Sequence, residues 1–210
     1  ALSTDHEATT ETMLQRADIA LYLAKENRGD VQVYRPEVDQ NTVARLSLMA
    51  DLHTAAVNQD FELAFQPQIE TATGRVVALE ALMRWRHPTR GVIEPDVFIP
   101  LAENSGAIRQ MSQAAIEGAL VTLQRLRGEG HDLSMAVNLS ARVLSNLEVP
   151  AWVEQMLLET SVPSARLTIE VTESTLIADP QRALRVLAEL RERQQRVELA
   201  ALHLLELLAG

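Results

Sequence analysis

The chain has 210 residues, of which 47% are hydrophobic and 23% charged, a composition typical of a globular protein that buries a sizeable core. Its formal net charge of −10 argues against general binding to nucleic-acid polymers or to anionic lipid, because both need a basic protein face. The lack of cysteine excludes disulfides, thiolate zinc sites and cysteine nucleophiles.

No apolar run approaches the roughly 20 residues that a membrane-spanning helix needs. The first residues, Ala1–Asp5, carry no basic segment or signal core. We therefore expect no membrane segment in this chain, and a cytoplasmic protein or the cytoplasmic part of a membrane-anchored parent.

The first 58 residues predict two helices with a short strand between them. Apolar residues recur at steps of three and four over 10–28, which predicts a helix. Val31–Tyr34 alternates like a strand that Pro36 ends. A second helix is predicted from about Asn41 to Val57 and is interpreted as a connector into the main domain. Its apolar side is predicted to be Val43, Leu46, Ala50, His53 and Val57.

From Phe61 onward, strands and helices alternate. The predicted strands are Leu63–Ile69, Val76–Trp85, Ser134–Leu139 and Leu167–Val171, the first two joined by a turn over 71–74. The predicted helices are Ser112–Arg127, Ala151–Glu159 and Gln181–Gln194. Such alternation predicts an α/β fold with a parallel sheet, in which ligands bind beyond the carboxyl ends of the strands.

Three oxygen-bearing residues interrupt otherwise apolar strands, namely Glu80, Asn138 and Glu170. Burying a carboxylate without a partner is costly, so some group must compensate each one. Two carboxylates and an amide at one rim suit a hard cation such as Mg²⁺ or Mn²⁺. The alternative is that they hydrogen-bond to arginine or to backbone at the sheet edge.

Other polar residues near the strand ends have two interpretations each. Arg84 shares a strand face with Glu80 and Leu82, where it could grip a phosphate or form a salt bridge with Glu80. Thr172 and Glu173 could anchor a neighbouring loop, or belong to an ordinary turn before the next helix.

Five strings of the chain form a recognisable series: Phe65–Ile69, Glu80–Pro88, Phe98–Glu103, Val137–Ser140 and Glu170–Ser174. In order and spacing they resemble the motifs of bacterial EAL domains, the cyclic di-GMP phosphodiesterases, and the resemblance covers about 59–199. The first 36 residues resemble the tail of a GGDEF domain, with Ala17–Lys25 as its last helix and Val31–Tyr34 as its last strand. The Gly-Gly-Asp-Glu-Phe signature is absent, so no cyclase activity is assigned.

The resemblance implies a fold and a domain plan. The fold would be α/β, a partial TIM-like barrel of the EAL type, preceded by the C-terminal helix and strand of a GGDEF domain. The implied segments are a GGDEF remnant at 1–36, a connector helix at 37–58, and the N-terminal part of an EAL domain at 59–210.

The resemblance also implies chemistry. EAL enzymes linearise cyclic di-GMP to pGpG with water activated between two Mg²⁺ or Mn²⁺ ions. The implied metal ligands are Glu80, Asn138 and Glu170. The implied contacts to the dinucleotide are Gln66, Leu82 and Arg84. The implied anchors of the loop after the fifth strand are Thr172 and Glu173.

The match ends after Leu199, and this departure puts catalysis in doubt. Where the family carries two metal-binding aspartates, this chain has Ala200-Ala201, and no lysine follows Lys25 to match the catalytic lysine. We therefore expect a chain truncated at both ends, with about the first half of the barrel and negligible hydrolysis on its own. The alternative function is a non-catalytic cyclic di-GMP receptor or protein-interaction module. We also expect a homodimer, through an EAL interface or the exposed half-barrel surface.

Overall fold

The computed structural model describes residues 9–10, 12–14, 16–17, 20–21, 31–34, 36–171, 180–193 and 196–199. At 36–43, 141, 180 and 196–199 it describes the backbone only. The chain divides into two compact units, Ala1–Asp51 and Leu52–Gly210, each of which is treated separately. No helix within the described ranges combines the length and the apolar character needed to cross a membrane.

In the first unit, the described residues from Thr10 to Leu21 are helical, as predicted. Thr9, just before them, is not helical. The prediction of a strand at Val31–Tyr34 is wrong, since these residues are neither strand nor helix. Val31 and Val33 are 91% and 71% exposed. Alternation sets only which side a residue faces, whereas a strand needs a hydrogen-bonded neighbour, and no described strand pairs with this segment.

Helix α2 (Pro36–Asn58) begins five residues before the predicted start. Proline suits a first helical turn because its missing N–H has no partner to lose there. The predicted apolar side is wrong: Leu46, Ala50, His53 and Val57 are exposed, and the side chain of Val43 lies outside the described part of the structure. The buried stripe is Leu48, Leu52, Ala55 and Ala56. Both stripes have helical spacing, and periodicity alone did not choose between them.

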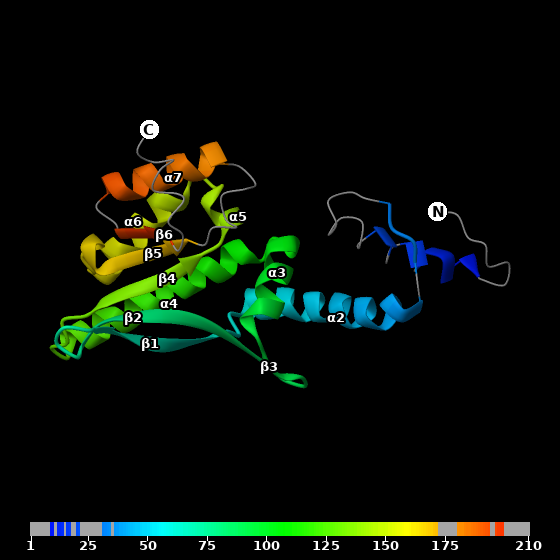
Figure 1. The fold of residues 1–210 in the computed structure, drawn as a ribbon, viewed down its shortest axis with the longest axis horizontal. Helices are drawn as coiled ribbons and strands as arrows, with labels where there is room; N and C mark the ends of the chain where they lie inside the picture. Colours follow the sequence, from blue (N-terminus) through cyan, green and yellow to red (C-terminus); the bar gives the residue numbers. More distant parts are fainter. Residues whose placement is uncertain are drawn as a thin grey trace. The chain divides into compact units, whose positions relative to one another are not determined.

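The second unit is built on one sheet (Figure 1). Its strands, in spatial order, are β1 (Glu62–Glu70), β2 (Arg75–His87), β4 (Ser134–Leu139), β5 (Leu167–Val171) and β6 (Arg196–Leu199). The β2–β4 and β4–β5 pairs are parallel, as predicted, and β6, a strand that was not predicted, pairs parallel with β5. β1 is antiparallel to β2 because the turn at 71–74 is too short for a crossover. A short β3 (Gly91–Ile93) pairs antiparallel with the end of β2.

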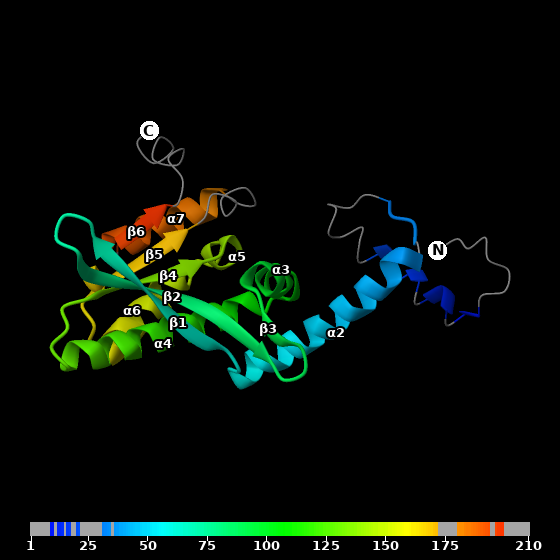
Figure 2. The ribbon, with the colours of Figure 1, turned by 60° about the horizontal axis from the view of Figure 1, so that its bottom comes forward.

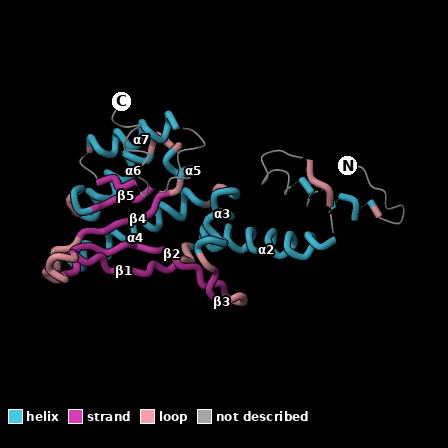
Figure 3. Tube along the Cα trace, in the orientation of Figure 1, coloured by secondary structure: helices cyan, strands magenta, loops and turns pink. Residues whose placement is uncertain are grey.

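Helices connect and cover the strands (Figures 1 and 3). The three predicted helices are α4 (Ile108–Gly128), α6 (Val149–Thr160) and α7 (Pro180–Glu192). α4 contacts β1, β2 and β4; α6 contacts α4, and α7 contacts α6 and β6. Three further elements were not predicted: α3 (Pro95–Ser105), α5 (Ala141–Leu144) and the 3₁₀ helix η1 (Ser164–Arg166). Pro100 lies inside α3 and hides its helical pattern, because an interior proline usually ends a helix.

The core lies between the sheet and these helices. Ala81, Val137 and Ile169 are register partners across β2, β4 and β5, and all three are buried. On the helix side, Leu120 and Leu190 are fully buried, as the sequence pattern indicated. Alternate strand residues point to the opposite face, which holds the polar positions.

That opposite face is concave. Gln68 Nε2 on β1 lies 3.5 Å from Glu170 Oε1 on β5, although β2 and β4 stand between the two strands. In a flat sheet β1 and β5 would be about 14 Å apart. The sheet therefore curls toward this face as a barrel wall does, and Figure 2 shows it from a second direction.

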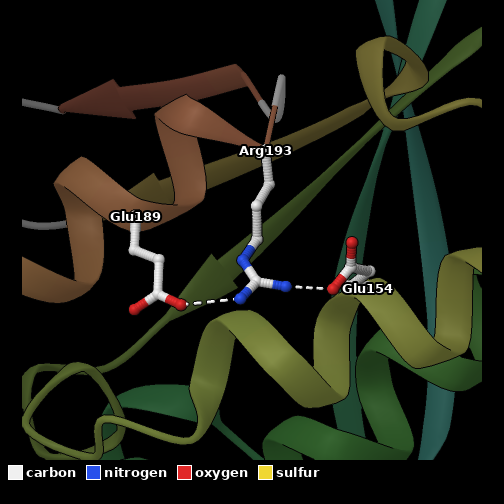
Figure 4. A network of polar contacts seen from close by, with 3 residues as sticks. All are labelled: Glu154, Glu189 and Arg193. Atoms are coloured by element: carbon white, nitrogen blue, oxygen red, sulfur yellow. Dashed lines mark hydrogen bonds and ion pairs between the residues drawn. The ribbon is translucent and has the colours of Figure 1, made fainter.

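An ion pair joins helices α6 and α7 (Figure 4). Arg193, directly after α7, donates to Glu189 Oε1 at 2.7 Å and to Glu154 of α6. The hydrogen bond with Glu189, helped by the negative charge of Glu154, raises the pKa of Arg193 despite some desolvation.

Candidate functional site

Glu80, Asn138 and Glu170 meet at the concave face. They come from β2, β4 and β5, and Asn138 and Glu170 are register partners. The Asn138 Nδ2 donates to Glu80 Oε1 at 2.8 Å. The three polar side chains lie on the same face of three neighbouring strands. The structure thus brings together the three residues that the sequence singled out.

Gln68 joins this group, and the sequence analysis missed it. Its side-chain Nε2 lies 3.5 Å from Glu170 Oε1, so an amide donor is within reach of this carboxylate. The signal in the sequence was its position two residues after Gln66, which places both on one strand face. The sequence did not show that the sheet curves enough to bring this face of β1 close to β5.

The donor set fits a hard divalent cation. Two carboxylates and an amide provide oxygen ligands of the kind that Mg²⁺ and Mn²⁺ prefer. A hydrogen bond from Asn138 Nδ2 to Glu80 Oε1 holds these two side chains together at 2.8 Å, and the amide oxygen Oδ1 of Asn138 would be the cation ligand. Within the described ranges, no group of three or more Asp, Glu, His or Cys side chains is arranged to hold a metal ion, so the amide of Asn138 would have to complete this donor set.

Leu82 and Arg84 continue the same strand face toward the carboxyl end of β2, and both are half-buried. The Arg84 Nη1 donates to the carbonyl of Met83 at 3.0 Å. The ion pairs found in the described part of the chain do not include one between Arg84 and Glu80, so the structure does not support the salt-bridge alternative. Gln66 pairs with Glu80 in the β1–β2 register and is exposed.

A cavity of about 500 Å³ opens beside these residues. It lies at the carboxyl ends of β2 and β4, between them and the helices α3 and α4. Its apolar lining includes Ile99, Ile108, Met111, Val137 and Leu139. Its polar lining includes Arg84, Glu103, Ser112, Asn138 and Ser140. An apolar hollow of this size with a few polar groups is typical of small-molecule sites.

The remaining predicted positions cannot be placed. Thr172 and Glu173, expected to anchor a loop, lie outside the described residues, as do Ala200 and Ala201. The backbone of β6 is described to Leu199.

The family model of the EAL domain matches residues 49–202, which is most of the second unit. This chain therefore belongs to the EAL domain family.

Curated relatives extend the similarity. The cyclic di-GMP phosphodiesterase PdeR of Escherichia coli (strain K12) is 36% identical over 200 residues, covering 95% of this chain and 30% of that protein. The bifunctional diguanylate cyclase/cyclic di-GMP phosphodiesterase MucR of Pseudomonas aeruginosa is 33% identical over 184 residues, covering 87% of this chain and 27% of that protein. The chain thus spans less than a third of the length of these relatives.

A solved structure agrees with the fold. The phosphodiesterase PaMucR in complex with c-di-GMP is 33% identical, with a TM-score of 0.68 over 73% of this chain and 62% of that one. The partial TIM-like barrel expected from the resemblance is consistent with this neighbour and with the curled sheet.

Proposed function

We propose that this chain is a cytoplasmic module that binds cyclic di-GMP at the concave face and, with a divalent cation, belongs to the machinery that hydrolyses it to linear pGpG. The observation that carries the proposal is the convergence of Glu80, Asn138 and Glu170 beside a cavity lined by Leu82 and Arg84. The name of the 33% identical neighbour, a phosphodiesterase in complex with c-di-GMP, supports the choice of nucleotide.

The chain's own groups have separate tasks in this proposal. Glu80, Asn138 and Glu170 would hold a Mg²⁺ or Mn²⁺ ion. A cation bound there supplies an acidified water and neutralises charge on the phosphate. The guanidinium of Arg84 would bind a phosphate oxygen, since an arginine fork matches phosphate geometry. Gln66 and Leu82 would contact the dinucleotide, with Leu82 offering apolar surface to a base.

Hydrolysis by this polypeptide alone is proposed to be negligible. The resemblance aligns Ala200-Ala201 with the metal-binding aspartates of the family, and alanine offers no ligand. Fewer carboxylates mean weaker cation binding, and each 1.36 kcal/mol of lost transition-state stabilisation slows the reaction about tenfold. This observation favours the second candidate function, a receptor that binds cyclic di-GMP without turnover.

One titration tests the proposal. Titration calorimetry with cyclic di-GMP should be run in buffers with Mg²⁺, with Mn²⁺ and with EDTA. We expect binding, with a lower Kd in the two metal buffers than in EDTA. Glu80→Gln should lower the gain in nucleotide affinity that the metal provides by at least about tenfold. The matched control Glu117→Gln, at an exposed residue of α4, should leave this gain unchanged. No binding by the wild-type chain would refute the proposal.

Product analysis of the same samples separates the two functions. Binding without pGpG supports the receptor, while turnover comparable to an intact EAL enzyme would overturn the prediction of negligible hydrolysis.

We also propose that the residues before the EAL domain form a GGDEF remnant at 1–36 and a connector at 37–58, ahead of EAL sequence at 59–210. The matches to PdeR and MucR support similarity beyond 49–202, because each is longer than that range. MucR, by its name, combines a cyclase with a phosphodiesterase.

A homodimer is the last part of the proposal. Ile69, Val76 and Val77 on the β1–β2 hairpin are 56%, 43% and 42% exposed, and exposed apolar side chains favour association. Sedimentation velocity should give a mass near twice that of one chain, and a concentration-independent monomer would refute it.

A further inference from the structure

Arg142 connects two walls of the cavity. One wall comes from α3, through Ile99, Pro100 and Glu103, and the other from the end of β4, through residues 138–140. Arg142 follows β4 by three residues and lies in α5. Its Nη1 donates to the backbone carbonyl of Glu103 at 2.7 Å, and its Nη2 donates to Asn104 Oδ1 at 3.1 Å. The guanidinium therefore spans from the β4 side to the α3 side.

Arg142 contacts α3 in its last turn. The last carbonyls of a helix lack intrahelical partners and carry partial negative charge, so a cation there is stabilising. α3 has no basic residue in its own last turn. The carbonyl of Glu103 is one of these terminal acceptors, and Arg142 supplies both the missing donor and the missing charge from another element.

The planar fork of arginine makes this contact directional. Its two terminal nitrogens reach a backbone oxygen and a side-chain oxygen on consecutive residues, which fixes the end of α3 relative to α5. A lysine could keep the charge but not both directed donors. Neither Arg142 nor Asn104 lines the cavity, so neither is placed to touch a ligand there.

We infer that Arg142 is a positioning residue that holds the α3 wall against the β4 wall, so that the cavity beside Arg84 and Asn138 is preformed for one base of the nucleotide. The inference rests on the proposed function. A preformed wall strengthens binding because less ordering free energy is lost when the ligand enters.

The test compares cyclic di-GMP binding by the full chain and four variants. Arg142→Ala should raise the Kd about tenfold, and Arg142→Lys should raise it less because it keeps the charge. The rise should be the same in Mg²⁺ and in EDTA, since Arg142 does not contact Glu80, Asn138 or Glu170. Asn104→Ala should give a smaller rise in the Kd. Adding it to Arg142→Ala should raise the Kd no further, because Arg142→Ala has already removed the hydrogen bond between Arg142 and Asn104.

The matched control is Arg193→Ala. Arg193 also makes two contacts, one with Glu189 of α7, the helix it directly follows, and one that reaches Glu154 of α6, but α6 and α7 do not line the cavity. This variant should lower the melting temperature without changing the Kd. Hydrogen exchange without nucleotide adds a ligand-independent reading: Arg142→Ala should speed exchange in the last turn of α3 and not in α6.

The outcomes separate the two proposals. If the wild-type chain binds and Arg142→Ala binds equally well, or if exchange in α3 is unchanged, the positioning role is wrong while the proposed function stands. If the rise in Kd is matched by Arg193→Ala, Arg142 acts only through general stability and the inference is overturned. If the wild-type chain does not bind cyclic di-GMP, the proposed function fails and the positioning role fails with it.

Discussion

A buried histidine closes the turn between β2 and β3. His87 is 7% exposed, and its Nδ1 accepts the backbone N–H groups of Thr89 and Arg90, both at 3.2 Å. Its ring also packs edge-on against Trp85, with ring centroids 5.4 Å apart. Both contacts come from backbone N–H groups, so Nδ1 is the acceptor for this turn.

His87→Phe should keep the aromatic packing but leave the two turn N–H groups without their acceptor. Because Thr89 and Arg90 are exposed and water can reach the turn, we expect a loss of only about 1 kcal/mol in the free energy of unfolding. Urea denaturation measures it. A variant as stable as the wild type would show that these hydrogen bonds add nothing.

At this scale the sequence predicted the candidate site well but incompletely. Glu80, Asn138 and Glu170 could be found because a polar residue in an apolar strand needs a local reason. Gln68 could not, because its contact with Glu170 joins residues 102 positions apart and depends on how far the sheet curls.

At the scale of elements, α4 and β1 approach closely at a glycine. A Cβ added to Gly118 would lie 2.9 Å from Cδ1 of Leu63, which is closer than such atoms normally come. Gly118 sits inside α4, where alanine would be favoured by about 1 kcal/mol. The contact with β1 therefore offsets this preference for alanine and leaves no room for a large side chain.

Gly118→Leu should force α4 away from β1 and cost about 1–3 kcal/mol of unfolding free energy. Gly118→Ala is the graded control and should be close to neutral, because the end of the Leu63 side chain can rotate and helix propensity improves. Thermal unfolding of both variants checks this. Equal stability of the leucine variant and the wild type would contradict the close approach.

The pairing of α6 with α7 rests partly on Arg193. Because its pKa is raised in the folded chain, its stabilisation is complete below the ordinary arginine pKa and is lost only as the pH rises through the folded value, in strongly alkaline solution. Arg193→Met should lower the melting temperature by a small amount that stays constant from about pH 6 to 9. A difference that disappears within that range would contradict the assignment.

Elements were predicted unevenly, for physical reasons. Strong amphipathic repeats located α4, α6 and α7 to within a few residues. α3 was missed because Pro100 interrupts its pattern, and the side of α2 that is buried was chosen wrongly because two stripes had equal spacing.

For the whole molecule, ligand binding and stability are linked. Cyclic di-GMP at 100 times its Kd should raise the free energy of unfolding by about 2.7 kcal/mol, because only the folded chain assembles the site from three strands. Differential scanning fluorimetry with nucleotide and Mg²⁺ should show a higher melting temperature, and EDTA should remove part of the shift. GMP at the same concentration is the control and should have little effect.

No shift with cyclic di-GMP at any concentration would contradict the proposed site as a whole. A shift that EDTA leaves untouched would instead show that the nucleotide binds without the cation.

By itself, the sequence determined the α/β alternation, the parallel pairing of β2, β4 and β5, and the three oxygen-bearing strand positions, because each is a local pattern of apolar and polar residues. Only the tertiary structure decided that the sheet curls until Gln68 meets Glu170, and that Arg142 reaches α3. Those contacts depend on the accumulated twist of several strands and on packing between distant segments, which no short stretch of sequence encodes.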